Sequence, residues 1–314
     1  MTPSEQASAT IGSSEAANAE AEDIFEVYSP TPYELMKRRA RSHPGFLIGT
    51  AVVLAVFFVA VFAPLIAPFD PFDQDISRRL INPVWGIDSS WLNALGTDAF
   101  GRDYLSRVIH GARVSMIVGI VAPMIAAVIG SLIGMIGGYY GGRVDAVVMY
   151  LINSKLALPG LVVALSLVAV FGGEVFVLVL VLAFLFWDRY AIVLRTVTQQ
   201  IRAQDFVTAA EAVGCSVPRI ILTEILPNVM NQIIVILTLE MAIAILIEAT
   251  LSFLGLGIQP PTPTWGNLIA EGRNFMFFKP YLVTIPGICL FFLAIAINMM
   301  GDGIRDITAP EGRN

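Results

Sequence analysis

Long stretches of this chain contain no charged side chain, and this pattern limits what the chain can fold into more than any other. No Asp, Glu, Lys or Arg occurs between Arg113 and Arg143. A membrane-spanning helix needs about 20 consecutive apolar residues, so this interval alone is long enough to cross a bilayer. Of the 314 residues, 56% are hydrophobic and 14% are charged, whereas about a quarter of a soluble protein is charged. The sequence therefore predicts an all-α protein that crosses a membrane several times.

Six apolar intervals are long enough to be transmembrane helices. They cover residues 46–67, 114–137, 145–171, 175–196, 229–253 and 281–300. The third interval contains Lys155 and Pro159. In the second, Gly130 and Gly134 form a G-x-x-x-G pair, which lets two helix backbones approach closely. We expect this pair to pack against another helix of the same chain.

The basic residues predict the orientation in the membrane. Lys37, Arg38, Arg39 and Arg41 precede the first span, and the positive-inside rule assigns such a cluster to the cytoplasm. With six spans, both termini and the segment 205–228 are then cytoplasmic. The loop 68–113 is then outside although it holds five arginines; it also holds six aspartates, and short loops weigh more than long ones in this rule.

The remaining segments differ in composition from the six-span domain, which we assign to residues 46–309. Residues 1–32 carry six acidic and no basic side chains, and we predict a disordered acidic cytoplasmic tail, with a docking segment as the alternative. This stretch lacks the features of a signal peptide. Residues 33–45 form a basic juxtamembrane segment, and residues 310–314 form a C-terminal tail.

Few residues in this chain are suited to metal binding or catalysis. Cys215 and Cys289 are far apart in sequence, and neither has metal-ligand spacing to His43 or His110. We therefore expect no disulfide, no metal site and no cofactor. An intramembrane enzyme would need His, Asp or Cys residues paired at catalytic spacing, so the sequence does not predict one.

One polar segment, DFVTAAEAVGCSVPRIILTEILPN (residues 205–228), lies between two apolar intervals. Ala209, Ala210 and Gly214 have helical spacing and form a small-residue face that another protein can approach closely. Ser216 is a candidate N-cap, and Pro218 lies just inside the next helix. The pattern predicts a helix, a turn and a second helix on the cytoplasmic side.

This segment resembles the EAA loop of bacterial ABC importer permeases. That loop reads approximately E-A-A, three residues, Gly, nine residues, Ile or His, one residue, Leu-Pro. Thr208-Ala209-Ala210, Gly214 and Leu226-Pro227 occupy those places. Thr208 replaces the usual Glu, and Glu224 replaces the usual Ile or His.

Three further blocks resemble the C-type permease of dipeptide, oligopeptide and nickel importers. They are Leu95–Gly119, Leu251–Ile269 and Asn298–Asp306. The resemblance extends over residues 33–309 and implies the fold of a type I ABC importer permease, with six transmembrane helices and a cytoplasmic coupling helix. It also implies location in the bacterial inner membrane.

The resemblance further implies a set of partners. They are a homologous B-type permease, two cytoplasmic ATPase subunits and an extracytoplasmic solute-binding protein; no nucleic acid is expected. The ATPase would dock on the coupling loop through Asp205, Thr208, Ala209, Ala210, Gly214, Pro218, Leu226 and Pro227. Since the chain has no G-x-x-x-x-G-K-[ST] phosphate loop, a partner must hydrolyse the ATP.

The chain is therefore predicted to be a non-catalytic permease subunit that forms half of a translocation pathway for peptides. Nickel, glutathione and opine-like solutes stay open as cargo. The alternative is a gradient-driven secondary transporter, which is expected to show inverted repeats and no coupling motif.

Two carboxylates within the fifth interval are candidates for the pathway. Glu240 and Glu248 are eight residues apart, which puts them on the same face of a helix, where they could meet a substrate amine. Ionisable groups inside a span are costly and usually functional. The alternative is a structural role, in a pair with Lys155 or a polar group of another span. Both roles stay open for Glu240, the structural role is favoured for Glu248, and Asp188-Arg189 is expected to pair structurally.

Overall fold

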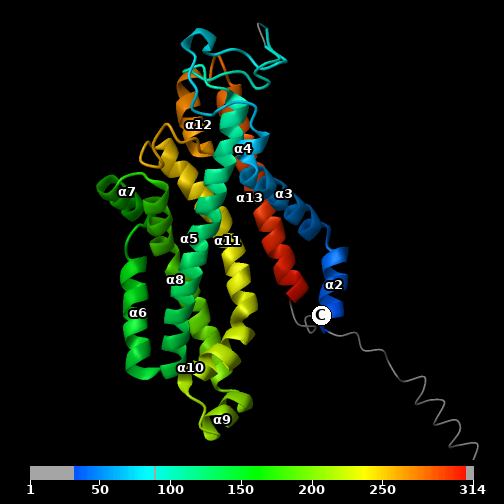
Figure 1. Cartoon of the computed structure of the whole chain (residues 1–314). Helices are drawn as coiled ribbons and strands as arrows, with labels where there is room; N and C mark the ends of the chain where they lie inside the picture. Colours follow the sequence, from blue (N-terminus) through cyan, green and yellow to red (C-terminus); the bar gives the residue numbers. More distant parts are fainter. Residues whose placement is uncertain (1–31, 88–89, 309–314) are drawn as a thin grey trace, which may run out of the picture. The chain divides into compact units, whose positions relative to one another are not determined.

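The computed structural model describes residues 32–87 and 90–308, which form helices joined by loops (Figure 1). The chain divides into two units, Met1–Ser42 and His43–Asn314. In the first unit the described part is helix α2, Pro32–Ser42, which carries the basic cluster. The predicted acidic tail lies outside the described residues, apart from Pro32.

The second unit is built around long helices. These are α3 (Pro44–Val61), α5 (Tyr104–Tyr140), α8 (Val175–Arg202), α11 (Leu226–Phe253) and α13 (Tyr281–Thr308). The shorter α-helices are α4 (Ala63–Ile66), α6 (Gly142–Leu156), α7 (Gly160–Phe171), α9 (Asp205–Ala212), α10 (Val217–Arg219) and α12 (Trp265–Gly272). Two 3₁₀ turns, η1 (Ile76–Arg78) and η3 (Arg273–Phe275), and one π-helix, η2 (Ile220–Ile225), complete the described elements.

Five helical stretches in the described ranges are long and apolar enough to cross a membrane. α10, η2 and α11 together form one of them, Val217–Phe253. α6 and α7 would count as a sixth span if they are taken together, although they are bent by 81°. Along the chain, α3, α6 and α11 run toward the loop at residues 68–103, whereas α5, α8 and α13 run away from it (Figure 1).

The interval predicted as a single span over residues 145–171 is divided in the structure. α6 ends at Leu156, and Pro159 takes the N-cap position of α7. A proline has no N–H to donate and disfavours the helical conformation of the residue before it, which explains the break. The 15 residues of α6 extend about 22 Å, less than the ~30 Å of a hydrocarbon core.

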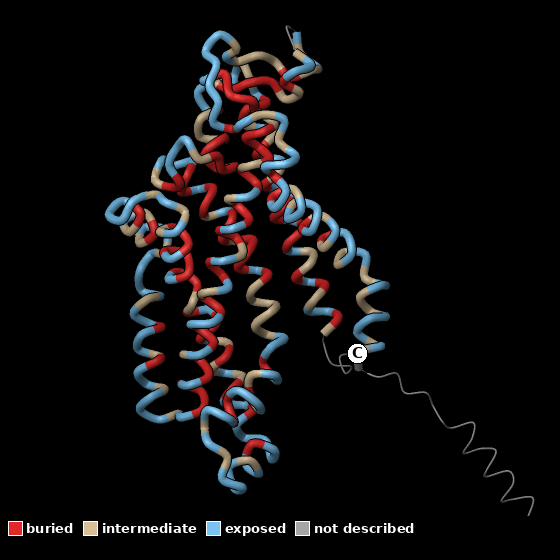
Figure 2. Tube along the Cα trace, viewed as in Figure 1, coloured by how far each residue is buried: buried red, intermediate tan, exposed pale blue. Residues whose placement is uncertain are grey.

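Glycines bring α5 and α8 into backbone contact. A Cβ atom added to Gly130 would lie 2.1 Å from the carbonyl oxygen of Trp187, and one added to Gly134 would lie 2.5 Å from that of Ala191. Gly138 continues the same row, 2.5 Å from the carbonyl oxygen of Arg195 by the same measure. The predicted packing of Gly130 and Gly134 within the chain is confirmed. Figure 2 shows the buried residues that run through the bundle.

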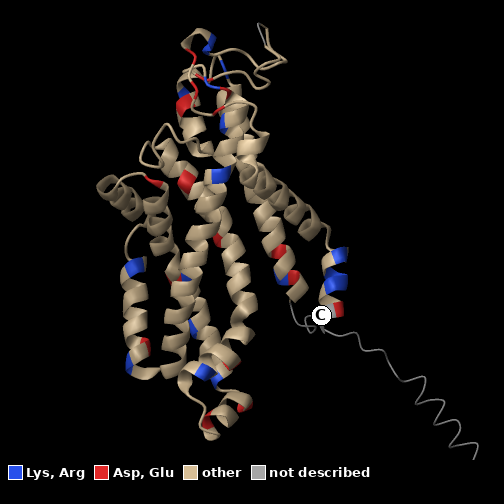
Figure 3. Ribbon diagram, viewed as in Figure 1, with Lys and Arg blue, Asp and Glu red and all other residues tan. Residues whose placement is uncertain are grey.

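The two ends of the bundle carry most of the charged side chains (Figure 3). One end consists of the described part of the loop at residues 68–103 together with α12; we call it the outer cap, after the orientation that the basic residues predict. α9 and α10 lie at the opposite end (Figure 1). His43, which caps α3 through its Nδ1 atom, is also 3.2 Å from the carboxylate of Asp306 near the end of α13.

We expect Gly130→Ala to destabilise the protein by about 1–3 kcal/mol, because its methyl group would force α5 away from α8. The measurement is the thermal unfolding midpoint of the purified protein in detergent. Gly287→Ala is the matched control, since a Cβ atom at this position in α13 meets nothing within 4 Å. Equal midpoints for the two variants would contradict the close contact.

Candidate functional site

The segment 205–228 forms an exposed helical turn at the α9 end of the bundle (Figure 1). Val207 is fully buried and packs in one cluster with Ile220 and Ile225 of the π-helix. The exposed side of the segment includes residues that we predicted for docking: Asp205, Thr208, Ala209, Gly214 and Pro218. Ala210 is half-buried and packs against the same cluster. α9 is therefore fixed on one side and open on the other.

Gly214 ends α9 with a left-handed backbone conformation. Its φ is +85°, its N–H donates to the carbonyl of Glu211 at 3.0 Å, and the N–H of Cys215 donates to that of Ala210 at 3.1 Å. These two bonds form a Schellman motif, whose positive φ favours glycine. A Cβ atom at Gly214 would meet nothing within 4 Å, so within this chain the turn itself requires the glycine.

The second half of the segment joins α11 without a break. Because Pro227 has no N–H to donate to Thr223, the helix widens before it: Ile220–Ile225 is a π-helix, and the N–H of Leu226 donates to Ile221. The Nδ2 atom of Asn228 then donates to the carbonyl of Glu224 at 2.6 Å. Leu226 and Pro227 therefore belong to the junction with a transmembrane helix.

The N-cap expected at Ser216 is only partly present. Ser216 takes the N-cap position of α10, and Pro218 lies in the first turn as predicted, but the Ser216 side chain makes no capping hydrogen bond. Its carbonyl accepts from the N–H of Ile220 at 3.0 Å.

Two of the ion pairs within the bundle involve adjacent residues of α8. Arg189 of α8 donates from Nη1 to Oε1 of Glu240 on α11 at 2.7 Å. Asp188, the preceding residue, pairs instead with Lys155 of α6. Glu240 is almost completely buried, and its Oε2 atom has no hydrogen-bond partner among the described residues. The partner of Glu240 is therefore Arg189 and not Lys155, and 52% of the Arg189 side chain is exposed.

Glu248 has a different environment from Glu240. It is fully buried, accepts a hydrogen bond from Ser252 Oγ at 2.8 Å, and lies 3.5 Å from Ser115 Oγ on α5. No Lys or Arg of the described ranges pairs with it. Its contacts link α11 to α5 inside the bundle.

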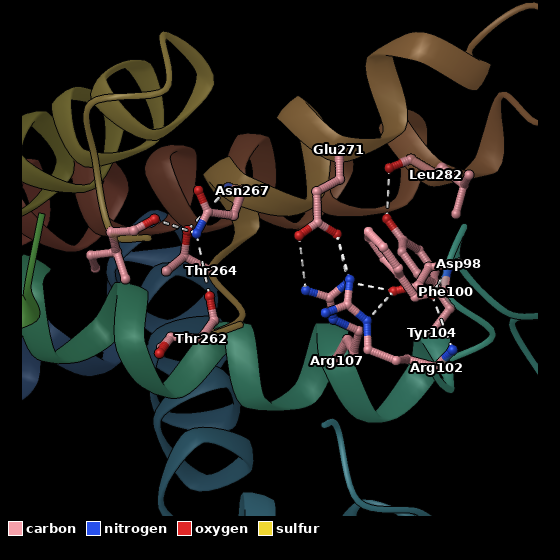
Figure 4. A network of polar contacts seen from close by, with 11 residues as sticks. Asp98, Phe100, Arg102, Tyr104, Arg107, Thr262, Thr264, Asn267, Glu271 and Leu282 are labelled. Atoms are coloured by element: carbon pink, nitrogen blue, oxygen red, sulfur yellow. Dashed lines mark hydrogen bonds and ion pairs between the residues drawn. The ribbon is translucent and has the colours of Figure 1, made fainter. Parts of the chain in front are cut away.

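The outer cap contains a buried network that was not predicted from the sequence (Figure 4). Arg107 is fully buried; its Nη1 atom is 2.6 Å from Glu271 Oε2, and it also bonds Asp98. Arg102 donates from Nε to Asp98 at 2.6 Å and from Nη2 to Glu271 at 3.0 Å. Two positive and two negative charges thus neutralise one another. We call these four residues the cap network.

Further hydrogen bonds tie the cap together. The hydroxyl of Tyr104 donates to the carbonyl of Leu282 at 2.6 Å, and Trp265 Nε1 donates to the carbonyl of Val108 at 3.0 Å. In the sequence, the charges of this loop bear only on the membrane topology. The i, i+4 spacing of Asp98 and Arg102 indicates one pair, but no local pattern connects Arg102 to Glu271.

The described residues contain no group of three or more His, Cys, Asp or Glu side chains that could hold a metal ion. The fold resembles that of a chain solved in "Inward facing conformations of the MetNI methionine ABC transporter", with a TM-score of 0.51 at 13% identity. The match covers 65% of this chain and 97% of that chain. The fold is therefore all-helical and of the type I ABC importer kind.

Sequence comparison identifies the family. Residues 130–313 match the family described as "Binding-protein-dependent transport system inner membrane component", and residues 31–83 match "N-terminal TM domain of oligopeptide transport permease C". This chain belongs to the binding-protein-dependent transport system inner membrane component family. It is thus a non-catalytic subunit in the inner membrane, and the predicted family and fold class are confirmed.

Similar proteins include permeases named for peptide transport. The di/tripeptide transport system permease protein DppC of Pseudomonas aeruginosa (strain UCBPP-PA14) is 37% identical over 297 residues, covering 95% of this chain and 98% of that protein. The dipeptide transport system permease protein DppC of Escherichia coli (strain K12) is 40% identical over 281 residues, covering 90% and 94%.

We expect Arg107→Leu to destabilise the protein by about 3–5 kcal/mol, because it leaves two buried carboxylates with one arginine. Arg79→Leu, at an exposed arginine of the loop before α5, controls for the loss of a positive charge. Chemical unfolding in detergent measures both variants. If Arg107→Leu unfolds at the same denaturant concentration as Arg79→Leu, the cap network does not stabilise the cap.

Proposed function

We propose that this chain forms half of the translocation pathway for dipeptides or similar short peptides in an ATP-driven importer. The observation that carries the proposal is the exposed turn at 205–228, an ordered helix with a small-residue outer side. The names of the similar permeases support peptides as the cargo. The missing phosphate loop means that ATP is hydrolysed by separate subunits.

The ATPase is proposed to bind the exposed side of α9 and the turn after it. Thr208, Ala209 and Gly214 have small side chains, so a partner's surface can approach the backbone closely. Val213 stands beside them with 85% of its surface exposed. Such a residue is well suited to enter a pocket of a partner.

The eight predicted coupling residues then have two kinds of role. Asp205, Thr208, Ala209, Gly214 and Pro218 are exposed and would contact the ATPase. Ala210, Leu226 and Pro227 would instead hold the segment on the bundle. Because η2 continues directly into α11, a movement of the docked segment is carried into a transmembrane helix. The substitutions at Thr208 and Glu224 leave both the turn and this junction intact.

This proposal fixes the orientation and the partners. If an ATPase binds α9, the α9 end is cytoplasmic and the outer cap is extracytoplasmic. An even number of crossings, with α6 and α7 as one bent span, then gives two cytoplasmic termini. We expect two ATPase subunits, a homologous permease as the other half of the pathway, and a solute-binding protein at the outer cap.

Glu240 is the better of the two candidates for the pathway. Glu240 itself is almost completely buried, but its partner Arg189 is half-exposed, so the carboxylate of a peptide could reach the Arg189 guanidinium. A cleft of about 320 Å³ lies between α8, α11 and α13, on the side of the bundle where Arg189 is exposed. It is lined by Val193, one turn from Arg189, and by Asn231, Gln232 and Arg305. Glu248 is enclosed by hydroxyl groups, which supports a structural role.

Docking is tested by Val213→Glu in the chain co-expressed with its partner permease and ATPase subunits. We expect the affinity for the ATPase to fall by about thirtyfold or more, because a central apolar contact is replaced by a charge. ATPase recovered by affinity purification of this chain is the measurement.

Ile87→Glu is the matched control, since Ile87 is equally exposed, at 84%, but belongs to the outer cap. Full recovery of the ATPase with Val213→Glu would show that the turn is not the docking site.

The energy source is tested in proteoliposomes that contain the complete transporter and its solute-binding protein. We expect uptake of a labelled dipeptide to require ATP and to persist when a protonophore collapses the proton gradient. Loss of uptake with the protonophore, at constant ATP, would favour the gradient-driven alternative. Uptake of nickel or glutathione in place of the dipeptide would change the assigned cargo.

A further inference from the structure

A hydrogen bond outside the coupling motif joins α9 to α5. The hydroxyl of Tyr139, in the last turn of α5, donates to Oε1 of Glu211 at 2.7 Å. Glu211 lies in the last turn of α9, between Ala210 and Gly214, where the motif has no fixed residue. The two residues are 72 positions apart in the chain, so this bond connects two separate parts of the bundle.

Tyr139 also contacts the end of α8. The guanidinium carbon of Arg202 lies 5.2 Å from the centroid of the Tyr139 ring, within the range of a cation–π interaction. The ring is buried in the same cluster as Val207 and Ile201. Tyr139 therefore stands where three helices meet: the ends of α5 and α8, and α9.

These contacts determine the orientation of α9 on the bundle more than they determine whether the helix forms. A helix of eight residues is too short to be stable alone, and burial of Val207 supplies its main attachment. Apolar packing of Val207 and of the half-buried Ala210 is not directional, so it still allows the helix to rotate. The Tyr139–Glu211 bond gives α9 a second point of attachment at its other end, which removes that freedom.

α5 extends from this point to the outer cap. It is one helix of 37 residues, about 55 Å long, and Arg107 of the cap network lies near its beginning. The glycine contacts with α8 hold the half of α5 nearest α9 in place. A displacement of α9 can therefore reach the cap through α5, in addition to the direct path from η2 into α11.

We propose that Tyr139 and Glu211 are positioning residues that transmit movement of the docked α9 into α5 during ATP-driven transport. This inference rests on the proposed function. It assigns the pair no contact with ATP or with the transported solute. Without the bond, α9 would still bind the ATPase, but ATP hydrolysis would no longer be tightly coupled to transport.

Tyr139→Phe tests the proposal in proteoliposomes with the complete transporter. This variant keeps the ring and its contact with Arg202 and removes only the hydroxyl. We expect normal recovery of the ATPase on purification and a roughly tenfold rise in ATP hydrolysed per peptide transported, as for loss of one hydrogen bond to a charged group. Glu211→Ala should do the same, and the double variant should add little. Glu211→Gln, which keeps an acceptor oxygen, should restore most of the coupling.

Tyr140→Phe is the matched control. Tyr140 is the next residue, its ring centroid is 5.5 Å from that of Tyr139, and 53% of it is exposed. Its hydroxyl makes no hydrogen bond with the described residues, so coupling should stay at the wild-type value.

Wild-type coupling in Tyr139→Phe would overturn the proposal, as would loss of the ATPase from that variant, since the pair would then be part of docking. Failure of the proposed function is seen separately, when Val213→Glu retains the ATPase.

Discussion

The contact between α5 and α8 is the interaction on which the other features of the bundle depend. The hydrophobic effect does not drive two helices together inside a bilayer, so helices there associate through close packing. Gly130, Gly134 and Gly138 provide this by letting the carbonyl oxygens of α8 approach the backbone of α5. α8 leads directly into α9, and α5 carries Tyr139 at one end and Arg107 at the other. A change in this packing would therefore displace both ends of the molecule.

Ion pairs set the positions of the remaining helices relative to one another. A charge inside a bundle is costly unless it has a partner, and the neighbours Asp188 and Arg189 find theirs on α6 and α11 respectively. In the outer cap, four charges hold the first loop, α5 and α12 together. Arg189 differs from the cap arginines because half of its side chain is exposed. That difference is why the Arg189–Glu240 pair suits a pathway and the cap network suits a scaffold.

Two prolines show how the backbone adapts at the edges of the spans. Backbone polar groups in a membrane need partners within the protein. At Pro159 the chain solves this by ending one helix and beginning another at a large angle. At Pro227 it keeps one continuous helix and widens a turn, with the Asn228 side chain bonding a carbonyl. The first solution gives a bent pair of helices, and the second connects the turn at 205–228 to α11.

The sequence by itself determined the apolar helices, the glycine packing face and the turn at 205–228, because each depends on residues that are close together in the chain. It did not determine the 81° bend between α6 and α7. Nor did it identify Arg189 as the partner of Glu240, 51 positions away, or Glu271 as the partner of Arg107, 164 positions away. Any charge in a span can be neutralised by several others, and sequence spacing does not choose among them. Only the packing of the helices brings one particular partner within hydrogen-bonding distance, and the same holds for Tyr139 and Glu211.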